Sequence, residues 1–134
     1  MADPTRRRYL DPDEILHYGH VQPGLLGGVR LIRTNLLPRA ADGMTLGRLV
    51  LLRHDHQSRE PSTLLAHELV HVRQYAELGF VVFAVRYVWE YLRNLVRFRD
   101  HHKAYLAISF EEEARREAAL WLAESTEGGT ETHT

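Results

Sequence analysis

The segment from His67 to His71 reads His-Glu-Leu-Val-His, and its residue types and spacing suit a metal ion. Histidines four residues apart on a helix project from one face, about 40° apart around the axis, so both imidazoles can reach one tetrahedral ion. Glu68 can instead reach a water on that ion. Zinc lowers the pKa of such a water toward ~7, and a carboxylate can then take its proton. The pattern predicts zinc bound by His67 and His71, with Glu68 as the general base of a peptidase.

The composition limits which side chains could complete such a site. The chain has no cysteine and nine histidines, so a transition-metal site must use His and carboxylates. His54 and His56 form a second pair just before the predicted metal helix, where we expect an exposed loop. His101 and His102 precede the last helix, and either of them or Tyr105 could donate a hydrogen bond to a developing oxyanion.

A catalytic zinc needs a third protein ligand and an open fourth position. In the metzincin pattern, a Gly lies three residues after the second His and a third His six residues after it. Here these positions are Gln74 and Glu77. Without the Gly the helix continues, and Glu77 points about 120° away from His71. The third ligand must therefore come from elsewhere in the fold.

The acidic run Glu111-Glu112-Glu113 offers the best candidates for that ligand. Acidic residues also favour a helix N-terminus through the macrodipole, which explains the run but not which carboxylate turns inward. Glu111 shares a helix face with Ala114 and Ala118, whose small side chains suit a close approach to the metal helix. We therefore prefer Glu111, and Glu113 is the alternative.

The elements around the motif follow from periodicity and punctuation. Residues 12–18 suit a short helix, and residues 29–33 and 44–53 are strand candidates that could pair antiparallel. The stretch 46–52 is a plausible edge along which an extended substrate could align by main-chain hydrogen bonds. Pro61 opens the metal helix, which should run over 62–78 and stop at Gly79.

A second helix is predicted over residues 80–98, because the polar residues of this segment fall on one narrow stripe: Arg86, Glu90, Arg93, Asn94 and Arg97. Its uninterrupted apolar run is far shorter than the ~20 residues that a membrane span needs. A helix that is apolar on nearly all sides is usually buried, and we expect burial here. The alternative is an amphipathic surface that contacts a membrane or a second subunit.

The C-terminal third should contain a loop over 99–107 and a helix over 110–124. Ser109, with Glu112 three residues later, has the pattern of a capping box. Residues 125–134 are Ser, Thr, Glu and Gly together with one His, and we expect them to be disordered.

The bulk composition bounds the fold and the partners. The chain has 134 residues, which fits one domain, and a net charge of −1, which argues against a nucleic-acid partner. Residues 1–10 lack the apolar core of a secretory signal, so we expect a cytoplasmic protein. The predicted fold is α+β, a small antiparallel sheet packed on a helical core. Its parts are an N-terminal extension over 1–27, a metallopeptidase domain over 28–124 and a tail over 125–134.

Three stretches resemble the gluzincin clan of metallopeptidases: residues 64–75, residues 45–52 and the segment Phe-Glu-Glu-Glu-Ala at 110–114. They are most similar to its smallest members, the minigluzincins and related compact bacterial proteins. The Glu-x-x-Ala element is also similar to the CAAX prenyl endopeptidase and HtpX families, in which the first Glu of Glu-x-x-Ala-Asp is the third zinc ligand. The resemblance assigns that role to Glu111. The final Asp of the pattern is Arg115 here, so another residue must orient a ligating His if that Asp does so.

The sequence thus favours a zinc metalloendopeptidase that acts on a peptide or protein substrate. The rival interpretation is a catalytically silent or latent zinc-binding interaction module, including one that associates with a membrane. The Arg at position 115 and the small size of the chain favour this rival.

Overall fold

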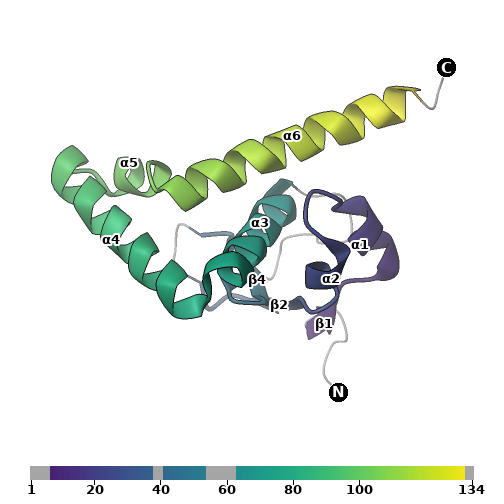
Figure 1. Cartoon of the computed structure of the whole chain (residues 1–134), viewed down its shortest axis with the longest axis horizontal. Helices are drawn as coiled ribbons and strands as arrows, with labels where there is room; N and C mark the ends of the chain where they lie inside the picture. The colour runs from purple at the N-terminus through teal and green to yellow at the C-terminus, as the bar shows by residue number, and fades with distance from the viewer. Residues whose placement is uncertain (1–6, 38–40, 54–62, 132–134) are drawn as a thin grey trace.

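The computed structural model describes residues 7–37, 41–53 and 63–131, and it has the α+β fold that was predicted (Figure 1). A small sheet packs against a larger helical part. In chain order the elements are β1 (Arg7–Tyr9), α1 (Pro12–His17), α2 (Pro23–Leu26), β2 (Arg30–Thr34), β3 (Gly43–Leu46), β4 (Leu49–Arg53), α3 (Thr63–Leu78), α4 (Phe80–Phe98), α5 (His101–Leu106) and α6 (Ser109–Glu131).

The sheet is mixed, whereas an antiparallel one was predicted. Its strand order is β1-β2-β4-β3, and the β2–β4 pair is parallel while the two outer pairs are antiparallel. The physical reason is a turn within the run 44–53, which the sequence reading treated as one strand. Gly47 has φ +65°, a conformation that glycine adopts at little cost, and the run becomes the hairpin β3–β4. Of the two strands of this hairpin, β3 lies at an edge of the sheet and β4 lies inside it.

The main core joins the sheet to α3 and to the N-terminal segment. Its buried residues come from β2, β4 and α3, and from the segment 10–26 that was assigned to an extension. Trp121 of α6 closes this core: its ring stacks on Tyr18 at 5.1 Å and its indole N–H donates to the carbonyl of His17 at 2.8 Å. The N-terminal segment therefore packs as part of the same body.

Helices α3 and α6 approach each other through small side chains. Ala114 and Ala118 of α6 are fully buried, as their small size led us to expect. Arg73 of α3 ties the same two helices together through ion pairs with Glu113 and Glu117. Figure 1 shows α6 running across α3 and continuing beyond it. This contact fixes the acidic first turn of α6 against the metal motif of α3.

Two expectations about the C-terminal third were wrong. Residues 101–106 form α5 rather than a loop, because Asp100 caps the helix by accepting a hydrogen bond from the backbone N–H of Lys103. Helix α6 continues to Glu131 rather than ending near residue 124, since no proline interrupts it.

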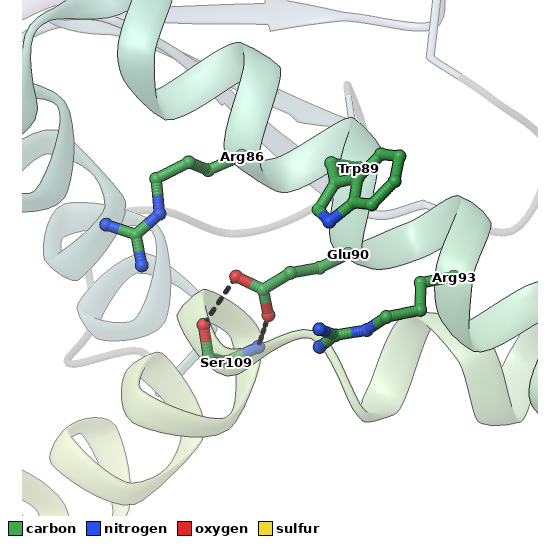
Figure 2. A pocket seen from close by; sticks show the side chains of 5 residues that line it. All are labelled: Arg86, Trp89, Glu90, Arg93 and Ser109. Atoms are coloured by element: carbon green, nitrogen blue, oxygen red, sulfur yellow. Dashed lines mark hydrogen bonds between the residues drawn. The ribbon is translucent and has the colours of Figure 1, made fainter.

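The start of α6 is held by a neighbouring helix rather than by a capping box. Both the backbone N–H and the hydroxyl of Ser109 donate to the carboxylate of Glu90, at 2.8 and 2.9 Å. Figure 2 shows this contact in a shallow surface pocket between Arg86 and Arg93 of α4. Glu90 thereby fixes the N-terminus of α6 against α4.

Helix α4 has the predicted bounds but not the predicted burial. Only Phe83 and Asn94 of this helix are buried, because α4 lies at the periphery of the fold and packs through one side alone (Figure 1). Across the described part of the chain, no helix combines the length and apolar character that crossing a bilayer requires.

Replacing Ala114 by leucine should force α6 away from α3. Extra methylene groups in a closely packed contact cost about 1–3 kcal/mol of unfolding free energy. Ala123→Leu adds the same groups at an exposed position of α6 and serves as the control. In urea, the unfolding free energy should be clearly lower for Ala114→Leu and almost unchanged for Ala123→Leu. Equal unfolding midpoints for the two variants would contradict the importance of this contact.

Candidate metal centre

Helix α3 presents His67, Glu68 and His71 as a group that could hold a metal ion. Candidate ligand atoms of the three residues all lie within 4.8 Å of one another, and the two imidazole centroids are 5.0 Å apart. His71 and Glu68 are buried, and His67 is partly exposed. The helical spacing therefore brings together the side chains that the sequence pattern selected.

Glu111 joins this group from the first turn of α6. Its Oε1 atom accepts hydrogen bonds from Nε2 of His67 at 2.9 Å and from Nε2 of His71 at 3.1 Å. Donor atoms around a tetrahedral zinc are about 3.3 Å apart, given metal–ligand distances of about 2.0–2.1 Å. Both nitrogen–oxygen distances are thus within a few tenths of an ångström of that spacing, and two imidazoles with one carboxylate are a donor set that zinc uses.

Glu113, the alternative ligand, is committed elsewhere. Its Oε1 accepts from the guanidinium of Arg73 at 3.0 Å and from the amide of Gln74 at 2.7 Å. These contacts hold its carboxylate on Arg73 and Gln74. The structure therefore brings Glu111, and not Glu113, to the histidine pair.

Gln74 fixes the orientation of His71. Its Nε2 donates to the carbonyl of Phe110 at 3.1 Å and to Glu113, so its Oε1 faces Nδ1 of His71, 2.7 Å away. Since an amide oxygen can only accept, Nδ1 of His71 must carry a proton, and Nε2 is the nitrogen turned toward Glu111. The sequence reading missed this role, although a Gln three residues after the second motif His lies on the same helix face.

Tyr87 of α4 holds the other oxygen of the Glu111 carboxylate. Its hydroxyl donates to Oε2 at 2.6 Å. Burial, and then the charge of Glu111, raise the pKa of Tyr87, so this hydroxyl stays protonated and remains a donor. The contact leaves Oε1 facing the two histidines. Nothing in the sequence connects Tyr87 with Glu111, because the pair comes from different helices.

The electrostatics of the group reflect these contacts. Burial alone would raise the pKa of Glu111, but hydrogen bonds from His67 and His71, the charge of His71 and the Tyr87 hydroxyl lower it. Burial alone would lower the pKa of His71, whereas the hydrogen bond to Glu111 and its charge raise it. Glu111 is therefore an ionised carboxylate, as a metal ligand needs to be.

Glu68 is anchored by the edge strand. The hydroxyl of Thr45 on β3 contacts Oε1 of Glu68 at 3.1 Å and the Glu68 backbone carbonyl at 3.0 Å. Burial raises the pKa of Glu68, and the neighbouring histidines only partly offset this. The strand also runs close by: a Cβ at Gly43 would lie 3.3 Å from Cγ of Glu68. Only glycine leaves that side chain undisturbed at this position.

A cavity of about 940 Å³ opens beside this group. Strand β3 and helices α3, α4, α5 and α6 contribute to its walls, which are mostly apolar. His101, His102 and Tyr105 all line it, as the sequence led us to expect of residues near the site. Burial, and then the charge of Glu111, raise the pKa of Tyr105 and keep its hydroxyl protonated.

The edge of β3 faces this cavity. The carbonyl of Asp42 accepts from the N–H of Arg53 in β4, and backbone groups of alternate residues point to opposite sides in an antiparallel strand. Gly43 and Thr45 therefore direct their backbone N–H and carbonyl groups outward, away from β4. One of these outward groups is occupied, because the hydroxyl of Tyr75 donates to the carbonyl of Thr45 at 3.2 Å.

Two further expectations concern residues around the site. Arg115, which stands where the resembling families have Asp, donates to the carbonyl of Leu106 at 2.6 Å and lines the cavity. It does not orient a histidine, and Gln74 does so instead. His54 and His56 lie outside the residues that the structure describes.

Comparison with known proteins gives one partial match. Residues 35–79 match a family model described as the eCIS core domain, which covers β3, β4 and α3 but less than half of the chain. The match includes the His-Glu-x-x-His motif and ends before Glu111. No curated protein and no solved structure matches the chain.

Replacing Gln74 by leucine should weaken metal binding while leaving the ligands in place. Removing the acceptor that orients a ligating histidine typically costs about 10–100-fold in metal affinity. Glu77→Gln, an exposed change on the same helix, is the matched control. Competition with a chromogenic chelator measures both affinities. An unchanged affinity in the Gln74 variant would rule out the orienting role.

Proposed function

We propose that this chain is a zinc-dependent metallopeptidase whose ion is held by His67, His71 and Glu111. The observation that carries the proposal is the position of Glu111, whose Oε1 lies within hydrogen-bonding distance of both imidazoles. Two His and one carboxylate are a common donor set of catalytic zinc, which keeps a fourth position open. The partial match supports it, because the eCIS core family is metallopeptidase-like.

The bound zinc would supply a Lewis acid and an acidified water next to the substrate carbonyl. Glu68 would act as the base: its carboxylate takes the proton of the attacking water and returns it to the departing amine nitrogen. Burial raises the pKa of Glu68, which makes the carboxylate a stronger base toward that proton. Thr45 keeps that carboxylate at the side of the cavity.

The edge of β3 would align the substrate. An extended peptide can pair with the outward backbone groups of Gly43 and Thr45, which places a peptide bond along the wall that carries Glu68. To pair fully, it must displace the Tyr75 hydroxyl from the Thr45 carbonyl. Since main-chain pairing ignores most side chains, we expect broad sequence selectivity.

The oxyanion that forms during attack needs a hydrogen-bond donor, and Tyr105 is our candidate. It lines the cavity, and its raised pKa keeps the phenol protonated. His101 is a second candidate: the Tyr91 hydroxyl contacts its Nδ1, which leaves Nε2 available as a donor.

A second candidate function is a zinc-binding module without turnover. The observation that favours it is the Tyr75 hydroxyl on the Thr45 carbonyl, which occupies part of the edge that a substrate would use. The two candidates share the metal site and differ only in whether Glu68 has a substrate to act on.

Replacing single carboxylates separates the ligand from its neighbour. Glu111→Ala should lower zinc affinity by more than about 100-fold, since losing a ligand costs more than losing its orienting partner. Glu113→Ala removes a carboxylate from the same helix turn and should keep stoichiometric zinc. Metal analysis of the purified variants measures both. Zinc that is retained in Glu111→Ala and lost in Glu113→Ala would reverse the assignment.

Glu68→Gln tests the base separately from the metal. The amide cannot take a proton, so turnover of an unfolded, fluorescently labelled protein should fall by about 10²–10⁴-fold while zinc content stays unchanged. Glu77→Gln, an exposed change on the same helix, should retain full activity. If the zinc-loaded parent is as inactive as the Glu68 variant, the chain is the silent module instead.

A further inference from the structure

Helix α4 carries a continuous apolar surface that faces solvent, which we call the α4 stripe. It consists of seven residues that are between 48% and 78% exposed: Val81, Val82, Val85, Val88, Trp89, Leu92 and Val96. Their spacings of three, four and seven keep them on one side of the helix. Exposed apolar side chains scattered singly are ordinary, but a contiguous patch of this kind marks an interaction surface.

The fold holds the α4 stripe outward. On the opposite side of the helix, Phe83 packs on Phe110, Tyr87 donates to Glu111, and Asn94 donates to the carbonyl of Ala104. Turning the stripe inward would break all three contacts. In Figure 1, α4 lies at one end of the molecule, with α5 and α6 on one side only. The stripe is therefore a fixed outer surface of the protein.

The polar border of the α4 stripe is positively charged. Arg86, Arg93 and Arg97 follow one edge of the helix, Arg99 lies at its C-terminal end, and all four are exposed. The single acidic residue within α4, Glu90, has both carboxylate oxygens bound to Ser109 (Figure 2). A chain with a net charge of −1 thus concentrates positive charge beside the α4 stripe.

We propose that the α4 stripe docks on an anionic lipid surface. A helix with one apolar face bordered by arginines lies in the plane of a bilayer, with its apolar side chains below the headgroups. Arginine stems can lie along the apolar surface while their guanidinium groups bind lipid phosphates bidentately. The arginine row is the charge complement of such a surface.

A second copy of the chain that packs antiparallel fits the α4 stripe less well. Two stripes packed antiparallel about a two-fold axis place the arginine rows of both helices along the same edge, where like charges repel. An anionic membrane turns the same row into an attraction.

Docking would also set the position of the cavity. Phe83 and Tyr87 line the cavity from the inner side of α4, and Val88 belongs both to its wall and to the α4 stripe. One helix thus separates the cavity from the docking face. A membrane-bound molecule would hold its cavity close to the lipid surface.

The two tryptophans make the test direct. Trp89 lies in the α4 stripe and is 64% exposed, whereas Trp121 is buried in the core. The full chain is mixed with vesicles of phosphatidylcholine and phosphatidylglycerol in equal parts. The proposal expects co-sedimentation, a blue shift of the Trp89 emission, and quenching by lipids brominated near the headgroup. The protein should bind vesicles of phosphatidylcholine alone at least about tenfold more weakly. The same loss of affinity is expected for the anionic vesicles at high salt.

Matched variants locate the surface. Val85→Asp should weaken binding to the anionic vesicles by about tenfold or more, and the double variant Arg93→Gln, Arg97→Gln should do the same. Leu16→Asp introduces the same charge at an exposed position of α1 and should bind like the parent. Equal binding by all variants would overturn the proposal. A second result would also overturn it: the parent does not bind vesicles, forms a dimer in sedimentation equilibrium, and becomes a monomer on Val85→Asp.

Discussion

One carboxylate oxygen, Oε1 of Glu111, accepts hydrogen bonds from two imidazoles on another helix, and the arrangement of the helices follows from that contact. A buried carboxylate is costly unless it is fully paired, so both of its oxygens must have partners. Tyr87 satisfies the second oxygen from α4. Ala114 and Ala118 of α6 let the backbones of α3 and α6 come close enough for the first oxygen to reach both imidazoles. The site thus requires three helices to be in register at once.

The parts of the site that were predicted from sequence are those that a single helix determines. His67, Glu68 and His71 lie within one turn of each other, so the helical period alone places them together. Gln74 lies on the same helix, and its role became visible only with its second set of partners, Phe110 and Glu113 on α6. The choice of Glu111 over Glu113 also depends on a contact across roughly forty residues, which periodicity cannot specify.

The fold shows the same division between local and long-range information. The bounds of α3 and α4 follow from Gly79, which has φ +83° and separates two periodic runs. The direction of strand pairing does not follow from composition, because it depends on whether Gly47 turns the chain within an apolar run. Apolar periodicity in α4 identified a helix but not its burial. Periodicity does not say which other elements cover a helix, and among the described residues no element covers the outer apolar face of α4.

The contact between Tyr75 and β3 has a consequence for solubility. An uncovered edge strand is a template on which other chains can stack and aggregate, and proteins usually blunt such edges with charge, proline or a bulge. This chain instead leaves β3 beside the candidate metal centre and covers the carbonyl of Thr45 with the hydroxyl of Tyr75 from α3. A phenol can swing away, whereas a proline cannot. One carbonyl of the edge is therefore covered reversibly, which leaves less unpaired backbone for another chain to stack on without permanently closing the edge.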